Sequence, residues 1–131
     1  MKPMNNTIVI IEDNLDNQVL FEAMLEGHFN IELHAAGQPA LEAFESKRPD
    51  LVLLDISLPG MDGLEVLRRI RERESMSGVP VIALTAHAMA GDRERFLAAG
   101  FCDYISKPVV DEEAFVAVVR SHLSASPSEG A

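Results

Sequence analysis

The sequence contains little cysteine, few basic residues and no long apolar run. Cys102 is the one cysteine among 131 residues, which excludes an internal disulfide and is typical of a reducing compartment. No run approaches the roughly 20 apolar residues that span a bilayer, and the N-terminus lacks the apolar stretch of a signal peptide. We therefore expect a cytoplasmic protein that does not associate with membranes.

Basic residues are outnumbered by acidic ones, 11 to 21, which gives a formal net charge of −10. Such a surface repels the phosphates of nucleic acids, so we expect no direct nucleic-acid partner. Four arginines between residues 68 and 73 are the local exception, but acidic residues share their predicted helix. Pairs such as Glu65–Arg69 and Arg68–Glu72 indicate a solvated helix face rather than a nucleic-acid site.

Apolar residues make up 47% of the chain, enough for one folded domain with a sizeable core. Short apolar runs alternate with segments of helical spacing from end to end. The predicted strands are 7–11, 31–35, 51–54, 81–84 and 103–105, and the predicted helices are 15–26, 39–47, 64–74, 91–99 and 112–123. We expect residues 1–124 to form the domain and residues 125–131 to form a short disordered tail.

This alternation predicts an α/β domain, a doubly wound parallel sheet with helices on both faces. The strand order 2-1-3-4-5 is compatible with the pattern, although the pattern alone does not fix it. Segment 31–35 alternates like an edge strand, whereas 51–54 and 81–84 are continuously apolar, as in strands covered on both faces. In that order the connections reverse direction between the first and third strands, where Asp13 and Asp55 would meet.

Polar residues follow the ends of four of these apolar runs: Glu12, Asp13, Asp55, Thr85 and Lys107. Ligands bind at the carboxyl ends of the strands in open parallel sheets, so three carboxylates, a hydroxyl and an ammonium would share one small area. Two carboxylates about 4 Å apart repel each other by roughly 4 kcal/mol at an effective dielectric near 20. Mg²⁺ relieves this repulsion and bridges carboxylates to phosphate oxygens.

A carboxylate in such a site can itself attack phosphorus and form an aspartyl phosphate. Asp55 is the best nucleophile candidate because it lies at the tip of the most buried predicted strand. The turn-rich segment 59–63 beside it leaves room for a phosphoryl donor. Lys107 can pair with a phosphoryl oxygen, and Thr85 can donate a hydrogen bond to it.

Several separately spaced motifs read IIEDN, LVLLDISLPGMDGLEVLRRIR, VPVIALTAHAM and AAGFCDYISKPV, and they span roughly residues 7 to 123. Together these motifs resemble the receiver domain of two-component response regulators. TAHAM and DYISKP are similar to the motifs of hybrid histidine kinase receivers and of DivK-like single-domain regulators. The resemblance implies a flavodoxin-like (βα)5 fold, bacterial two-component phosphorelay signalling and Mg²⁺ as the cofactor.

The resemblance also implies roles for individual residues. Asp55 matches the phosphoacceptor, and Lys107 matches the lysine that pairs with the phosphoryl group. Thr85 and Tyr104 match the hydroxyl and the aromatic residue that respond to phosphorylation. The implied metal ligands are Glu12, which usually acts through a metal-bound water, Asp13, Asp55 and the backbone carbonyl of Ser57.

Three further positions follow from the same resemblance. Pro108 matches a proline whose preceding peptide bond, from Lys107, is typically cis in the family. Ser57 and His87 occupy variable positions that would flank the phosphoryl group and tune its lifetime.

The implied mechanism needs two kinds of protein partner. A histidine kinase or histidine phosphotransfer protein would present a phosphohistidine to Asp55. The modified domain would then change its affinity for a downstream protein through the face formed by residues 91–99, 103–105 and 112–123. We expect a monomer or weak homodimer that turns over no external substrate and is therefore not an enzyme.

Alternative hypotheses stay open. We expect a stand-alone receiver because the chain ends soon after the last predicted helix, but a receiver excised from a hybrid kinase or a larger regulator has the same sequence pattern. A magnesium-dependent phosphohydrolase of the haloacid dehalogenase type would carry a second Asp two residues after the nucleophile, where this chain has Ser57. A flavin-binding module would need a phosphate loop rich in Ser, Thr or Gly at residues 12–16, which read EDNLD.

Overall fold

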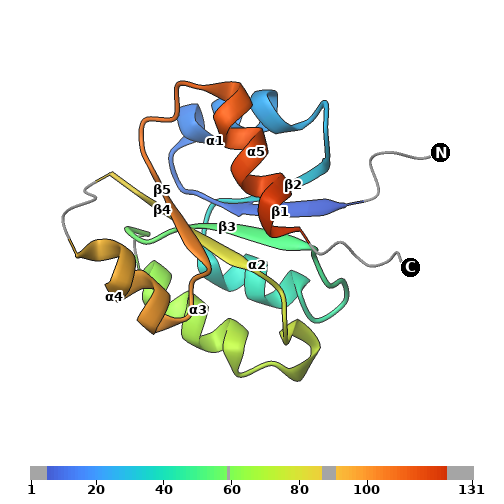
Figure 1. The fold of residues 1–131 in the computed structure, drawn as a ribbon. Helices are drawn as coiled ribbons and strands as arrows, with labels where there is room; N and C mark the ends of the chain where they lie inside the picture. The colour runs from blue at the N-terminus through green and yellow to red at the C-terminus, as the bar shows by residue number, and fades with distance from the viewer. Residues whose placement is uncertain (1–5, 59, 87–90, 124–131) are drawn as a thin grey trace, which may run out of the picture.

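The computed structural model describes residues 6–58, 60–86 and 91–123, in which five strands alternate with five α-helices (Figure 1). The predicted tail and His87 lie outside the described residues. The strands are β1 (Thr7–Ile11), β2 (Asn30–His34), β3 (Leu51–Asp55), β4 (Val81–Thr85) and β5 (Asp103–Ser106). The helices are α1 (Leu15–Leu25), α2 (Gly37–Ala43), α3 (Gly63–Arg71), α4 (Asp92–Ala99) and α5 (Glu112–His122), with a 3-10 turn, η1 (Glu74–Met76), after α3.

All strand pairs are parallel, and their order is β2-β1-β3-β4-β5. The predicted order and the predicted flavodoxin-like fold are therefore confirmed. The register aligns the carboxyl ends of the strands, since Ile11 lies opposite both His34 and Leu54. Thr85 lies opposite Ser106 in the same way. Residues that follow β1, β3, β4 and β5 consequently emerge at one edge of the sheet.

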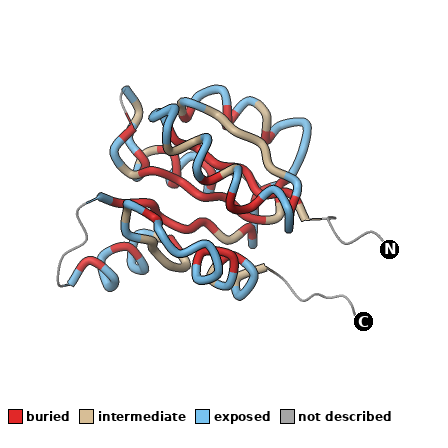
Figure 2. The backbone as a smooth tube through the Cα atoms, turned by 90° about the horizontal axis from the view of Figure 1, so that it is seen from above, coloured by how far each residue is buried: buried red, intermediate tan, exposed pale blue. Residues whose placement is uncertain are grey.

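Two apolar layers enclose the sheet, and Figure 2 shows long buried stretches along the strands and buried positions on one side of the helices. Successive residues of a strand point to opposite faces. Val9 and Ile11 pack with α2, α3 and α4, whereas Ile8 and Ile10 pack with α1 and α5 (Figure 1). β1, β3 and β4 are buried along their whole length, as their continuously apolar sequences predict. No helix in the described part of the chain is long and apolar enough to cross a membrane.

Three helix boundaries differ from the predicted ones by two or more residues, and the largest difference is at the end of α2, which lies at Ala43 rather than at residue 47. α2 begins at Gly37, two residues before the predicted start, which leaves Pro39 inside the first turn. A Cβ atom on Gly37 would lie 2.5 Å from a side chain of α3, so the two helices meet where only glycine fits. α3 ends at Arg71 rather than at residue 74. The Arg71 guanidinium donates to the carbonyls of Val79 (2.9 Å) and Gly100 (3.2 Å), which ties the end of α3 to the segments before β4 and β5.

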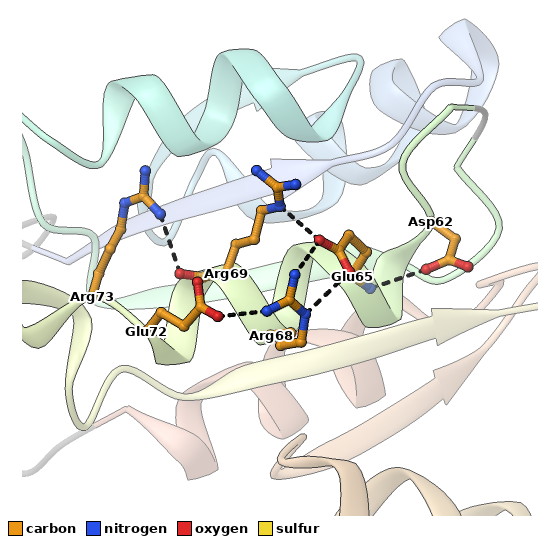
Figure 3. Close-up of polar contacts among 6 residues, drawn as sticks. All are labelled: Asp62, Glu65, Arg68, Arg69, Glu72 and Arg73. Atoms are coloured by element: carbon orange, nitrogen blue, oxygen red, sulfur yellow. Dashed lines mark hydrogen bonds and ion pairs between the residues drawn. The ribbon is translucent and has the colours of Figure 1, made fainter.

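The exposed face of α3 carries the arginines that the sequence places among acidic residues. Figure 3 shows Arg68 between Glu65 and Glu72, while Arg69 Nε lies 2.7 Å from Glu65 Oε2. Hydrogen bonds from Arg68 and Arg69 lower the pKa of Glu65 to about 2. The predicted solvated helix face with internal ion pairs is therefore confirmed.

Candidate functional site

Three carboxylates converge at the carboxyl edge of the sheet. Glu12 follows β1 and is fully buried, Asp55 is the last residue of β3 and is buried, and Asp13 is exposed. One oxygen from each carboxylate lies within 4.8 Å of the others. The alignment of β1 with β3 produces this cluster. The sequence predicts that Asp13 and Asp55 meet here, because the connections between strands reverse direction between β1 and β3.

The Glu12 side chain and backbone are both held by hydrogen bonds. Its amide donates to His34 O (3.0 Å), and its carboxylate accepts from Asn14 N (3.1 Å). Its carbonyl accepts from Gln18 Nε2 at 2.6 Å. Burial raises the pKa of Glu12, and the charge of Asp55 adds to this effect, against the lowering influence of its hydrogen-bond donors. Burial therefore makes the Glu12 carboxylate easier to protonate than a glutamate in water.

Both oxygens of the Asp55 carboxylate have donors. Ser57 N donates to Oδ1 (2.9 Å) and Lys107 Nζ to Oδ2 (3.0 Å). The loop beyond β3 returns directly over the strand end, where Gly63 N donates to Ile56 O (3.1 Å). A Cβ on Gly63 would lie 2.4 Å from Ile56 Cα and 2.7 Å from Asp55 O. Glycine at the start of α3 thus permits the close approach that fixes the backbone around Asp55.

Lys107 joins the two buried carboxylates across the sheet. Its ammonium lies 3.0 Å from Asp55 Oδ2 and 3.2 Å from Glu12 Oε1, and its backbone amide donates to Thr85 O (2.7 Å). Burial alone would lower the pKa of Lys107, but the hydrogen bond and charge of Asp55, together with Glu12, outweigh burial and raise it. The lysine is therefore a cation at neutral pH. The bond from Lys107 to Pro108 is cis, the isomer that the resemblance implies.

The charges of this cluster do not balance, because three carboxylates face one ammonium. A divalent cation would compensate the excess, and the donors are all hard oxygen atoms, the ligands that Mg²⁺ prefers. The residues present therefore fit the metal that the resemblance implies. Asp13 is the exposed member of the cluster, so a metal ion and a phosphoryl donor would reach the site from its side.

Thr85 and Tyr104 occupy the strands next to this cluster. Thr85 is buried at the end of β4. The Tyr104 ring packs against Phe96 of α4, with the ring centroids 5.6 Å apart, and lies on the side of the sheet that α2, α3 and α4 cover. Ser57 has an exposed side chain directly after Asp55 and Ile56. Thr85 is joined to the cluster through its carbonyl, which accepts from Lys107 N, and Tyr104 contacts α4 through Phe96.

Sequence reasoning missed the two residues that shape the backbone of the site, Gln18 and Gly63. Gln18 lies one turn into α1, so the helical spacing from Asn14 could have pointed to it. Gly63 directly follows Asp62, whose side chain caps α3 by accepting from Glu65 N. A glycine just inside a capped helix start is a signal of close packing.

Comparison with known proteins identifies the family. A model of the response regulator receiver domain matches residues 8–120. The chain belongs to the response regulator receiver family. It is thus a receiver domain of two-component signalling systems.

Individual relatives include both kinds of receiver that the motifs suggest. The polar-differentiation response regulator DivK of Brucella ovis is 39% identical over 122 residues, which cover 92% of this chain and 98% of DivK. The histidine kinase BarA of Escherichia coli K12 is 38% identical over 115 residues, which cover 87% of this chain and 12% of the kinase. The structure also superposes on the receiver domain of the sensor histidine kinase PA1611 from Pseudomonas aeruginosa, with a TM-score of 0.79 and 40% sequence identity. The superposition covers 88% of this chain and 95% of the PA1611 domain. Its structure contains a magnesium ion coordinated in the active-site cleft.

Proposed function

We propose that this receiver accepts a phosphoryl group on Asp55 from a phosphohistidine of a histidine kinase or phosphotransfer protein. One observation carries the proposal: the buried Asp55 carboxylate, held by Ser57 N and Lys107 Nζ, lies in a cluster with Glu12 and Asp13. An Asp55 oxygen would attack phosphorus, the bond from phosphorus to the imidazole nitrogen would break, and the electron pair would leave with the histidine. The freed imidazole would then take up a proton.

The other residues of the cluster would hold the reacting groups in place. Asp13, Asp55 and the Ser57 carbonyl would ligate Mg²⁺ directly, and Glu12 through a water. Bound Mg²⁺ would neutralise the charge that collects on the phosphoryl oxygens in the transition state. Lys107 already contacts Asp55 and would follow the transferred group as an ion-pair partner.

The modification would reach the α4, β5 and α5 face through Thr85 and Tyr104. Phosphorylation adds negative charge and acceptor oxygens, toward which the Thr85 hydroxyl would turn. Lys107 N already donates to Thr85 O, and the Tyr104 ring already packs on Phe96 of α4. Thr85 and Tyr104 lie on the neighbouring strands β4 and β5, so a change at Thr85 would alter the surroundings of Tyr104 and shift the population of two states that bind a downstream protein differently. Ser57 and His87 would set the lifetime of the phosphoryl group.

Exposed apolar side chains beside the cluster support a protein donor rather than a small metabolite. Leu15 and Val19, one turn apart at the start of α1, are 70% and 60% exposed, and Val110, which follows Pro108 and Val109, is 83% exposed. A contiguous exposed apolar patch marks a contact surface, and these three side chains would form one beside the acidic cluster. α1 and α5 lie side by side above the sheet (Figure 1), so a helical partner could contact both while presenting a phosphohistidine to Asp55.

Intact-mass measurement tests the proposal. Wild type with acetyl phosphate and Mg²⁺ should gain the mass of one phosphoryl group, and Asp55→Asn should gain none. Asp16→Asn is the matched control, because it makes the same charge change at an exposed position of α1 and should behave as wild type. An equal mass gain in wild type and Asp55→Asn would exclude Asp55 as the acceptor. Steady release of phosphate from p-nitrophenyl phosphate would favour the phosphohydrolase alternative, and we expect none.

A further inference from the structure

We propose that Gln18 is a positioning residue for the metal site, acting through the backbone of the acidic turn at residues 12–14. This inference rests on the proposed function, because it concerns the magnesium that the phosphoryl transfer requires. Gln18 touches none of the carboxylates. It holds the peptide that carries them.

The hydrogen bonds of Gln18 close the turn from the α1 side. Its side-chain Nε2 donates to Glu12 O at 2.6 Å, and its backbone amide donates to Asn14 O at 3.0 Å. Within the turn, Asn14 N donates to the Glu12 carboxylate at 3.1 Å. From the sheet side, Glu12 N donates to His34 O at 3.0 Å. The residues on both sides of Asp13 are therefore fixed to the sheet and to the helix.

Asp13 needs this support more than the other ligands. Its carboxylate is exposed, whereas Glu12 and Asp55 are buried and share the ammonium of Lys107. Packing cannot orient an exposed side chain, so the direction of Asp13 depends on the peptides before and after it. Holding a ligand in its binding geometry before the ion arrives reduces the ordering cost of binding.

The chemistry of the side chain matters as well as its reach. The Glu12 carbonyl lies just beyond Ile11, the last residue of β1 that pairs with β3. The amide of Ile56, the residue after β3, donates to Leu84 O on β4 rather than to Glu12 O. A side-chain donor from α1 therefore takes the place of a strand partner. Because the Gln18 amide is neutral, it satisfies the carbonyl without adding a second cation that would compete with a divalent ion for the carboxylates.

The substitution Gln18→Met tests the inference, because it keeps the length and the apolar stem of the side chain and removes the donor. We expect Mg²⁺ to bind about three- to tenfold more weakly by isothermal titration calorimetry. This is less than the roughly 10- to 100-fold typical when a ligand atom itself loses its partner. The rate of phosphorylation by acetyl phosphate should fall at limiting Mg²⁺ and return to the wild-type value at saturating Mg²⁺.

A matched control separates positioning from general effects. Gln38→Met makes the same change at an exposed residue of α2, whose amide contacts Glu42 of the same helix, and should leave Mg²⁺ affinity unchanged. Equal affinity in wild type and Gln18→Met would overturn the inference. So would a loss of stability in urea without Mg²⁺ that leaves the affinity intact, since that result assigns Gln18 a structural role alone.

A second measurement on the wild-type protein needs no variant. The Gln18 side-chain amide protons should exchange with solvent more slowly than those of Gln38 in nuclear magnetic resonance spectra, and should shift when Mg²⁺ is added. Equal exchange rates would contradict the hydrogen bond to Glu12. Failure of wild type to accept phosphate would remove the proposed function, whereas failure of these Gln18 tests in a phosphorylatable protein would remove this inference alone.

Discussion

Removing a carboxylate of the proposed metal site should stabilise the fold when no metal is present. Asp13 lies with Glu12 and Asp55 in one cluster, whose excess negative charge Lys107 compensates only in part. Asp13→Asn keeps the size of the side chain and removes one charge. We therefore expect this variant to unfold at higher urea concentration than wild type in the presence of EDTA, although it loses part of the proposed function.

The distances set the size of the effect. Oxygens of Asp13 and of each other carboxylate lie within 4.8 Å, where two like charges repel by about 0.9 kcal/mol in water and about 3.5 kcal/mol at an effective dielectric of 20. Asp13 is exposed, so the value for water applies to both of its pairs. Screening at about 0.1 M salt leaves about 1 kcal/mol of repulsion in total. This is an upper limit for the net effect, because the substitution also removes the attraction between Asp13 and the Lys107 ammonium, and it corresponds to at most roughly 4 °C in the midpoint of thermal unfolding for a domain of this size.

Urea unfolding with and without Mg²⁺ measures this balance. In EDTA, Asp13→Asn should exceed wild type in unfolding free energy by up to about 1 kcal/mol. In Mg²⁺ the order should reverse, because wild type binds the ion more tightly and gains stability from binding. Asp16→Asn, exposed in the first turn of α1, should show neither change. A destabilised Asp13→Asn in EDTA would refute the view that the carboxylates repel one another at the site.

Three further predictions concern other parts of the structure. Lys107→Met removes the ammonium that two buried carboxylates share, so without Mg²⁺ it should lower the unfolding free energy at neutral pH by about 3 kcal/mol in urea titrations. Gly63→Ala should lower the unfolding free energy by at least about 1 to 3 kcal/mol, because the added Cβ would lie 2.4 Å from Ile56 Cα. Gly27→Ala is the control and should be nearly neutral in the same assay, because its Cβ would have no atom within 4 Å. The Glu65 carboxyl should titrate near pH 2 by nuclear magnetic resonance and move toward its ordinary pKa of 4.5 in Arg68→Gln. Its pKa is depressed in the fold, so the stabilisation is present at neutral pH and is lost as pH falls through about 2. An unshifted carboxyl would show that these ion pairs do not persist in solution.

The strand ends could be predicted from the sequence because two simple regularities determine them. Continuous apolar runs mark central parallel strands, and parallel strands present their carboxyl ends at one edge of the sheet. Glu12 and Asp13 follow such a run, Asp55 ends one, and Lys107 follows the edge strand β5. The structure brings all four together. No knowledge of loop conformation was needed, since the register of the sheet fixes where each residue emerges.

The positions that depend on contacts between distant segments could not be predicted in the same way. Gly37 begins α2 early because its backbone approaches α3, and Arg71 ends α3 beside the carbonyls of Val79 and Gly100. Helix propensity and spacing carry no information on such contacts, because they describe one segment at a time. Gln18 was missed for a different reason, because its partner is the carbonyl of Glu12, which is only six residues away but lies in the turn before α1 rather than in the helix.

Phosphorylation of Asp55 should increase the affinity of the proposed metal site for Mg²⁺. The cluster holds three carboxylates against one ammonium before modification. An aspartyl phosphate replaces the single charge of Asp55 with a charge of roughly −1.5 to −2, so the site becomes more negative while Lys107 stays the same. A divalent cation is then attracted more strongly, and by linkage a bound cation must favour the phosphorylated state by the same factor. The repulsion among the carboxylates, which makes Asp13 destabilising in the unphosphorylated domain without metal, therefore couples Mg²⁺ binding to phosphorylation. Asp13→Asn should consequently reduce both the stabilisation by Mg²⁺ and the yield of phosphorylated protein.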